Sequence, residues 1–348
     1  MKDNKSFIFY NLSFFRFSAH FRVQNSFKMP VYTGNIIRSV LGRAMHSIHF
    51  GMKEACITCP IRSECRYSSL YAYLFESPFD HPFIKENDED LSVRYKRKQY
   101  PKPFLFCPPP GGYYVEGEDL EIVFSLIGRA ISVFPFMVCA LEEFAKNGIL
   151  KRRSRIILEK ILWEDVIGDE DSVVMYDSSA NRIRMPDTNH IIDTEKIMED
   201  SLGSILPSRH IRKLKVRFLT PFRYKHKNRL GVPLTFEIFV KKMLERLTLL
   251  SVHKKAPNNA GTFVIEHRRL LSMAGEIREI QDMSWFELKR YSSSQKDYMI
   301  LGGYIGTIQF EGEIEPFMPL INICEYVQIG SKISFGFGKY EATVLDEE

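Results

Sequence analysis

The chain has 348 residues, of which 45% are hydrophobic and 26% are charged, and its formal net charge is +5. This length is about twice that of a typical domain, and the apolar content is sufficient for two hydrophobic cores. No apolar run approaches the roughly 20 residues that cross a bilayer, and the polar start Lys2–Lys5 is unlike a secretory signal. We therefore expect a two-domain cytoplasmic protein that is not associated with a membrane.

The first half of the chain predicts alternating strands and helices separated by long insertions. Tyr10–Val23 alternates apolar and polar residues, which is typical of a strand with one buried face. Thr33 can cap a helix that starts at Gly34 and runs to about Phe50. The other elements expected here are strands over Leu120–Leu126 and Ile156–Trp163 and a helix over Arg129–Asn147, closed by Gly148.

The second half predicts a complete and more compact element order. A strand over Lys213–Thr220 is followed by a helix over Thr235–Val252, strands over Met283–Arg290 and Tyr304–Phe310, a helix over Glu315–Gln328 and a strand over Tyr340–Leu345. This is the order of the ferredoxin-like fold, whose sheet is a common RNA platform. We predict an α+β protein of two tandem ferredoxin-like (RRM-like) domains, residues 1–205 and 206–348, the first with Cys-containing and basic insertions.

A glycine-rich loop, Gly330–Lys339, lies between the last predicted helix and the last strand. Glycine lets the backbone approach a ligand closely, and lysines beside exposed amides suit a polyanion. The loop lacks the Gly-Lys-Ser/Thr ending of a nucleotide-binding loop and precedes a strand instead of a helix. We expect the loop to hold RNA through Gly330, Lys332, Gly336, Gly338 and Lys339, and the plainer alternative is a tight hairpin.

Basic residues are segregated along the chain. Leu206–Leu230 contains nine Lys and Arg and no Asp or Glu, and Lys151–Arg155 is a second cluster. Such segregation favours a groove that follows a phosphate backbone, whereas the alternative is a solvated surface balanced by acidic loops. The residues expected to bind RNA here are Arg152, Arg153, Arg155, Lys213, Lys215, Arg217, Arg223 and Lys225.

These features resemble the CRISPR-associated endoribonucleases that process precursor CRISPR RNA, within the RAMP superfamily. The segments that carry the resemblance are Pro30–Gly34, Cys59–Pro60, Cys65–Tyr67, Leu74–Glu76, Arg217–Arg223, Gly302–Gly306, Glu315–Leu320 and Phe335–Tyr340. The resemblance implies one metal-independent cut within each CRISPR repeat. A 2′-hydroxyl attacks the phosphate, which leaves a 2′,3′-cyclic phosphate and a 5′-hydroxyl and yields mature guide RNA.

Members of this family commonly use a histidine in the first helix. At about 100° per residue, His46 and Lys53 lie nearly opposite the apolar stripe of the helix that begins at Gly34. We assign proton transfer to His46, phosphate stabilisation to Lys53, and positioning or acid–base assistance to Tyr32. His49 is a second candidate base, and the alternative is that both histidines are ordinary surface residues.

Three cysteines form a cluster with C-x2-C-x5-C spacing. Cys56, Cys59 and Cys65 could bind a metal with Cys107, and His49 or His81 could replace Cys107. A structural zinc is the favoured metal, an iron–sulfur cluster is an alternative, and reduced unliganded thiols are the plainest interpretation. Cys139 and Cys324 lie on apolar helix patterns and are expected in the core. No cofactor is expected for the cleavage itself.

Two functions of different classes follow from these features. The first is an endoribonuclease whose partners are CRISPR repeat RNA and the proteins of a CRISPR effector complex. The second is a non-catalytic RNA-binding RAMP subunit of such a complex, and a metal-cluster redox protein is a weaker third. An exposed histidine on the first helix favours the enzyme, because a protein that only binds RNA has no need of an imidazole there.

Overall fold

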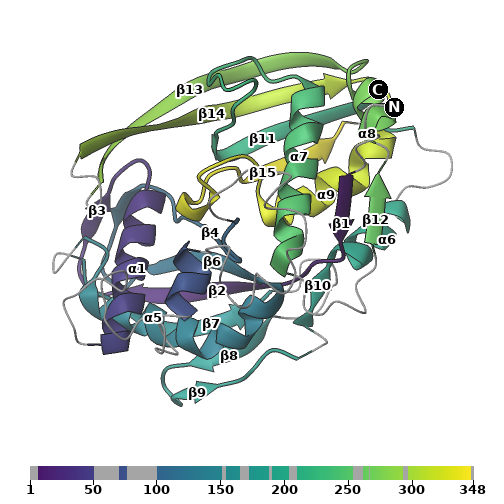
Figure 1. Ribbon diagram of the computed structural model, residues 1–348. Coiled ribbons are helices and arrows are strands. Elements are labelled where there is room, and N and C mark those ends of the chain that lie inside the picture. The colour runs from purple at the N-terminus through teal and green to yellow at the C-terminus, as the bar shows by residue number, and fades with distance from the viewer. Residues whose placement is uncertain are drawn as a thin grey trace. The chain divides into compact units, whose positions relative to one another are not determined.

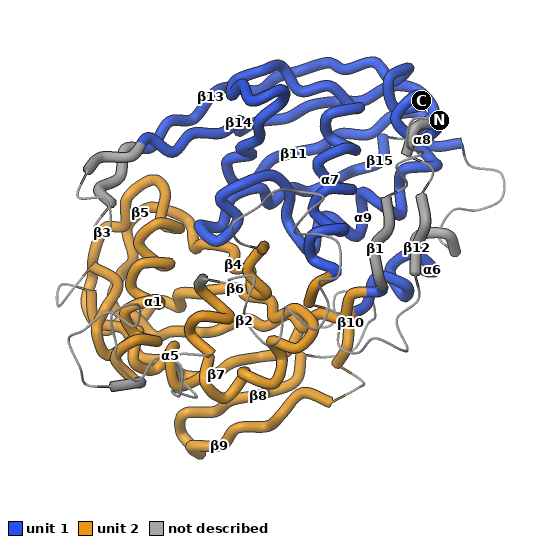
Figure 2. Tube along the Cα trace, in the orientation of Figure 1, with its two compact units in different colours: residues 1–11, 193–251, 260–348 blue, residues 12–192, 252–259 orange. Residues whose placement is uncertain are grey.

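The computed structural model describes residues 7–50, 70–76, 100–150, 154–164, 172–187, 190–203, 210–253, 262–265, 267–292 and 297–345. The chain forms two compact units (Figure 2). Unit 1 contains Met1–Asn11, Asp193–Ser251 and Ala260–Glu348, and unit 2 contains Leu12–Ile192 and Val252–Asn259. The main division therefore falls ahead of the position expected after residue 205, and the first eleven residues belong with the C-terminal half.

Unit 2 is built on a seven-stranded sheet, of which six strands follow the order β4-β6-β2-β7-β8-β9 and are antiparallel to their neighbours. The seventh strand, β10 (Ile192–Asp193), pairs with β2 outside this order. The strands of unit 2 are β2 (Ser13–Val23), β3 (Phe27–Met29), β4 (Phe104–Cys107), β5 (Gly112–Tyr114), β6 (Asp119–Ile127), β7 (Ile156–Trp163), β8 (Val173–Asp177) and β9 (Arg182–Ile183). Of these, β3 and β5 pair with each other in a separate two-stranded sheet. The helices of unit 2 are α1 (Gly34–Phe50), the π-turn η2 (Ala72–Glu76), the 3-10 turn η3 (Gly128–Val133) and α5 (Phe134–Asn147). The first four strands of the sheet have the ferredoxin-like order, as predicted (Figure 1).

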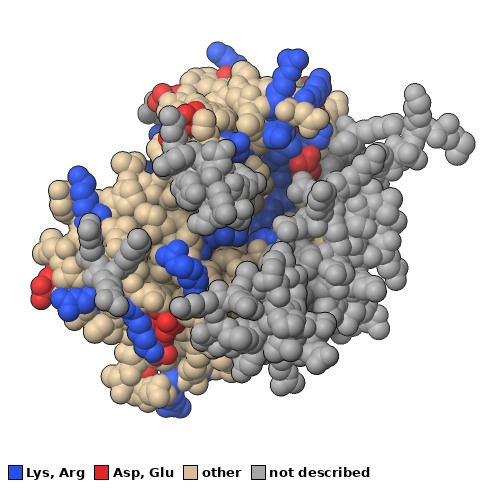
Figure 3. Space-filling view, turned by 60° about the vertical axis from the view of Figure 1, so that its left-hand side comes forward, with Lys and Arg blue, Asp and Glu red and all other residues tan. Residues whose placement is uncertain are grey.

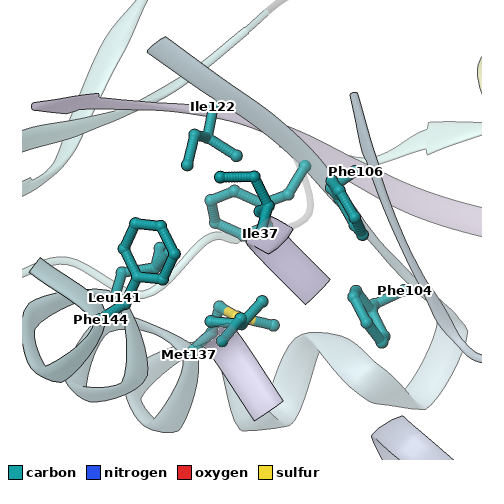
Figure 4. Close-up of a pocket in the computed structure, with 9 residues that line it drawn as sticks. Ile37, Phe104, Phe106, Ile122, Met137, Leu141 and Phe144 are labelled. Atoms are coloured by element: carbon teal, nitrogen blue, oxygen red, sulfur yellow. The ribbon is translucent and has the colours of Figure 1, made fainter. Parts of the chain in front are cut away.

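The core of unit 2 lies between α1, α5 and one face of this sheet. Phe17 of β2 contacts Phe134 of α5 at a ring-centroid distance of 4.7 Å, and Phe21 contacts Phe144 at 5.7 Å. A small apolar cavity of about 10 Å³ remains between the helices and strands β4 and β6 (Figure 4). Its lining has no polar side chain, so this cavity is a packing defect of the core and has no group that would recognise a ligand.

Unit 1 contains a four-stranded antiparallel sheet in the order β13-β14-β11-β15, which is again ferredoxin-like. Its strands are β1 (Phe7–Tyr10), β11 (Lys213–Phe222), β12 (Thr262–Ile265), β13 (Arg278–Ser292), β14 (Asp297–Glu311) and β15 (Tyr340–Val344), and β10 (Ile192–Asp193) lies at the division. Its helices are α6 (Thr194–Gly203), α7 (Phe236–Leu250), α8 (His267–Ala274) and α9 (Met318–Val327), with 3-10 turns η6 (Ser251–His253), η7 (Glu315–Phe317) and η8 (Ile333–Phe335). No helix among these described segments is long and apolar enough to cross a membrane.

Phe239 of α7 lies at the centre of the unit 1 core. Its ring packs against Phe310 of β14 at 5.6 Å and against Tyr340 of β15 at 5.4 Å. Thr235 caps α7 by accepting a hydrogen bond from the Ile238 amide at 3.2 Å, which fixes the start of the helix where it was expected. The alternation along β11 places Leu214, Val216 and Phe218 in this core and turns Lys213, Lys215 and Arg217 to the other face.

The expected first strand was wrong at its beginning. Tyr10 ends β1, which pairs with β12 in unit 1, and β2 starts at Ser13 in unit 2. Asn11 stands between them, and its side-chain oxygen accepts hydrogen bonds from the Thr194 hydroxyl at 2.8 Å and the Glu195 amide at 3.2 Å. The strand is therefore interrupted at Asn11, whose side chain provides hydrogen-bond acceptors for the first turn of α6.

Candidate functional site

The polar face of α1 is covered by the short helical segment that contains η2. Ile37, Ala44 and Met45 are buried on the opposite face of α1, as the helical period predicts. Gly42 leaves room for Phe75, because a Cβ built at Gly42 would lie 3.1 Å from the Phe75 ring. The Arg38 guanidinium lies over the same ring, 5.2 Å from its centroid.

His46 lies on this covered face and is half-buried. Its ring meets Tyr71 edge to face, with centroids 6.2 Å apart and an interplanar angle of 83°. The Nε2 atom of His46 is buried and has no hydrogen-bond partner among the described residues. A buried polar atom without a partner costs roughly 1–3 kcal/mol, and such atoms call for an explanation such as a catalytic role.

The expectation that His46 points openly to solvent was wrong in this respect. Its position opposite the apolar stripe is as predicted, but Tyr71 and Phe75 pack over that face. Helical periodicity places a side chain on a face and cannot show that another segment covers it. The rings of Tyr71 and Phe75 stack at 5.3 Å and 3°, so His46 rests against a rigid aromatic pair.

The other candidate catalytic residues are either buried or outside the described residues. Tyr32 is only 8% exposed, and burial together with the nearby Cys107 thiol raises the pKa of its hydroxyl far above the usual value. A phenol in this setting is a poor proton donor to RNA. Lys53 and the side chain of His49 lie outside the described residues, but Arg43 is exposed one turn before His46. Arg43 is a cation that the sequence analysis did not single out.

The glycines of the loop between α9 and β15 fit the backbone tightly against other parts of unit 1. Gly338 has φ +81°, and a Cβ there would lie 1.9 Å from the Ile329 carbonyl oxygen. Gly330 has φ +91°, and a Cβ there would lie 2.6 Å from the carbonyl oxygen of Arg223. These positions require glycine for packing, whether or not a ligand is bound.

Several residues that were expected to hold RNA in this loop are instead buried or form hydrogen bonds within the protein. Phe337 is fully buried, and Gly336 and Gly338 are buried as well. The Lys339 ammonium donates a hydrogen bond to the Glu325 carbonyl at 2.9 Å, at the end of α9. Lys332 is half-buried with φ +65°, and Ser331 is exposed.

The basic residues of β11 share one face of the sheet but differ in their acidic neighbours. Lys215 is exposed, whereas Arg217 forms an ion pair with Glu341 of β15 at 2.7 Å. Lys213 stands opposite Glu311 in the β14 register. Lysine and arginine side chains gather on the face shown in Figure 3. Of the remaining predicted RNA-binding residues, Lys225 and Arg155 are exposed, and Arg152 and Arg153 lie outside the described residues.

The cysteine cluster remains a prediction. Cys56, Cys59 and Cys65 lie outside the described residues, and Cys107 is half-buried beside Tyr32. In the part of the chain that the structure describes, no group of three or more His, Cys, Asp or Glu could hold a metal ion. Cys324 is buried as expected. The expectation for Cys139 was wrong, because this thiol is exposed on the outer side of α5.

Comparison with known proteins divides the chain in the same way as the structure. Residues 12–188, just over half of the chain and all within unit 2, match a family model described as the AF_1859_N N-terminal domain, so this part belongs to that domain family. Residues 216–340, within unit 1, match the model of the CRISPR-associated endoribonuclease Cas6. This C-terminal part of the chain is thus similar to the Cas6 family of CRISPR-associated endoribonucleases.

Solved structures share this fold over nearly the whole chain. Cas6 from Thermus thermophilus and a Cas6 product complex each match with a TM-score of 0.51 and 13% identity, over 95% of this chain and 99% of theirs. A chain of a partial Cas6-RT-Cas1–Cas2 complex matches with a TM-score of 0.55 and 14% identity over 97% of this chain. This chain spans 46% of the length of that larger chain. The search of curated proteins found no match.

Proposed function

We propose that this protein is a Cas6-type endoribonuclease that cleaves precursor CRISPR RNA once within each repeat by attack of a 2′-hydroxyl on the adjacent phosphate. The products are a 2′,3′-cyclic phosphate and a 5′-hydroxyl, and no metal ion takes part. The observation that carries the proposal is the buried Nε2 of His46, which has no hydrogen-bond partner among the described residues and lies in the helix of unit 2 that packs on η2. Such an atom is available to take or give a proton at an RNA oxygen.

The reaction needs proton transfer and stabilisation of negative charge on the phosphorane. We assign proton transfer to Nε2 of His46. Arg43 is exposed and lies three residues before His46, on the adjoining side of α1. Lys53, seven residues after His46 in the sequence, keeps its predicted role in stabilising the phosphate. Tyr71 orients the imidazole through the edge-to-face contact at 6.2 Å. Tyr32, which is buried, becomes a structural residue in this proposal.

RNA binding is assigned to the basic face of β11 and to the loop before β15. Lys215 on β11 and Lys225 just after this strand are exposed, and Lys332 in the loop is half-buried. Each phosphate that a lysine neutralises contributes to affinity and makes binding weaker at high salt. The match to a chain of a Cas6-RT-Cas1–Cas2 complex supports further CRISPR proteins as partners. A structural zinc at Cys56, Cys59, Cys65 and Cys107 stays a proposal for the part of unit 2 that includes these thiols.

The second candidate function is an RNA-binding subunit without catalysis. The covered face of α1 favours it, because Tyr71 and Phe75 limit access to His46. The buried Nε2 argues the other way, since a protein that only binds RNA gains nothing from an unsatisfied imidazole nitrogen.

One experiment separates these functions. End-labelled CRISPR repeat RNA from the same genome is incubated with the protein in excess EDTA, beside a copy with a single 2′-deoxy substitution at the cut site. We expect one cut in EDTA, no cut in the deoxy copy, and a 5′-hydroxyl on the downstream product. Tight binding without any cut would instead assign the protein to the non-catalytic class, and a cut of the deoxy copy would exclude 2′-hydroxyl attack.

A further inference from the structure

The strand pair β13–β14 carries an exposed aromatic platform that is distinct from the glycine loop and from α1. Residues Asp297–Gly303 of β14 pair only with β13, so this pair extends beyond the rest of the sheet (Figure 1). Trp285 of β13 stands directly opposite Tyr304 of β14, and their rings meet edge to face at 5.2 Å and 86°. The side chain of Trp285 is 38% exposed.

Gly302 supports the indole of Trp285. A Cβ built at Gly302 would lie 2.8 Å from two atoms of the indole ring, so any larger residue would displace it. Ile300, which is 54% exposed, lies on the same side of β14 as Gly302 and Tyr304 because side chains alternate along a strand. The strand pair thus presents an apolar surface with one indole held in a fixed orientation.

The platform is joined to cationic groups on one side. The Arg223 guanidinium donates a hydrogen bond at 2.7 Å to the carbonyl of Gly302, the same residue that lies under the indole. Tyr304 also packs against Tyr224 at 6.0 Å, and Tyr224 leads into a tight turn with φ +48° at Lys227 and φ +63° at Asn228. The exposed cations of this basic turn are Lys225, Lys227 and Arg229. On the other side the exposed carboxylate of Glu287 stands opposite Gly302.

This combination of groups selects one class of ligand. We propose that Trp285 stacks on a base of single-stranded RNA whose phosphates run along Arg223 and the basic turn. An indole face offers a base about 1–3 kcal/mol of stacking, and this stacking tolerates any base. The basic side attracts the phosphate backbone, and Glu287 repels it from the other side, so the strand has one favoured path across the platform. The proposal rests on the proposed function, because it supposes that the protein binds RNA.

The chain contains its own reporter for this contact. It has two tryptophans, and Trp163 is 2% exposed whereas Trp285 is 38% exposed. We would titrate the full chain with 2′-O-methyl hexaadenylate, which cannot be cut, and with an abasic oligomer of the same length and charge. Stacking on Trp285 predicts that the hexaadenylate changes the tryptophan fluorescence, that the abasic oligomer does not, and that Trp285→Phe abolishes the change.

Affinity for labelled repeat RNA gives an independent readout. Trp285→Ala is expected to weaken binding about tenfold, and Gly302→Ala to weaken it by displacing the indole. Tyr113→Ala is the control, since Tyr113 is 74% exposed on β5 of unit 2 and the Lys28 ammonium already lies over its ring, 4.9 Å from the centroid. If repeat RNA binds and is cut while Trp285→Ala and the fluorescence show no effect, the stacking site is refuted and the proposed function stands. If the unaltered protein neither binds nor cuts repeat RNA, the proposed function fails and the stacking site fails with it.

Discussion

His46 and Tyr71 meet edge to face at 6.2 Å, and this contact fixes an imidazole whose Nε2 has no hydrogen-bond partner in the described part of the chain. The contact brings a residue of α1 together with one that lies 25 positions further along the chain. It separates two roles that the sequence analysis could not distinguish. In the function we propose, His46 supplies the reactive nitrogen and Tyr71 holds the ring that carries it.

Tyr71→Ala is therefore expected to lower the rate of RNA cleavage by about 10- to 100-fold, because a freed imidazole is poorly placed for proton transfer. Tyr71→Phe keeps the ring that faces His46 and should retain most of the rate. Single-turnover cleavage and RNA affinity, measured separately, check this prediction. A fall in affinity with an unchanged cleavage rate would show that Tyr71 contacts RNA and does not position His46.

Gly338→Ala is expected to destabilise unit 1 strongly, because the new methyl group would overlap the Ile329 carbonyl, 1.9 Å away. Gly231→Ala is a matched control, since Gly231 has a similar φ of +72° but nothing within 4 Å of a built Cβ. The control should cost about 1–2 kcal/mol from its backbone conformation alone. The Gly338 variant should exceed this by about 2 kcal/mol or more in urea unfolding. Equal losses would show that the loop relaxes easily.

Glu325→Gln is expected to make the stability of the protein less dependent on pH. Burial raises the pKa of the Glu325 carboxyl, although its hydrogen bond from the Ala342 amide, at 2.6 Å, and the charge of Lys339 act in the opposite direction. A carboxyl with a raised folded-state pKa costs stability that appears as pH rises from its unfolded pKa through its folded pKa. The variant should thus be more stable than the original protein at neutral pH, and the difference should vanish in acid. Thermal unfolding at several pH values measures it, and a difference that grows in acid would contradict the assignment.

Lys215→Ala should weaken RNA binding and lower its salt dependence by about one phosphate contact, because Lys215 is exposed on the basic face of β11. Glu341→Ala is the complementary variant, since it releases Arg217 from its ion pair at 2.7 Å and should strengthen binding. Affinity measured over a range of salt concentrations tests both. An unchanged salt slope in the Lys215 variant would remove this face from the path of the RNA.

Much of the fold was predictable from local pattern. The expected cap at Thr33 and the helical pattern after it predicted α1 from Gly34 to about Phe50, and the strand pattern predicted β7 over Ile156–Trp163. The order of elements was enough to predict both ferredoxin-like sheets, because that fold follows from connection order. The pairing of β1 with β12 was not predictable, since more than 250 residues separate the two strands and the sequence of neither strand indicates which strand it pairs with.

The candidate site was predictable only in part, for a physical reason. Helical spacing placed His46 on the polar face of α1, but the segment that covers this face belongs to a π-turn, η2, whose geometry has no local sequence signature. Tyr32 was expected near the site and is instead buried beside Cys107. Lys339 was expected to face RNA and instead bonds to the Glu325 carbonyl. In each case a tertiary contact decided the role of a side chain whose type alone allowed several.

The central claim is that His46 performs the chemistry and does not hold the RNA. Single-turnover cleavage and equilibrium binding of the same repeat RNA, compared between the original protein and His46→Ala, test this claim most directly. The account predicts that the variant loses cleavage by about 100-fold or more while its affinity for the RNA changes by less than about threefold. Unchanged cleavage by His46→Ala would contradict the account.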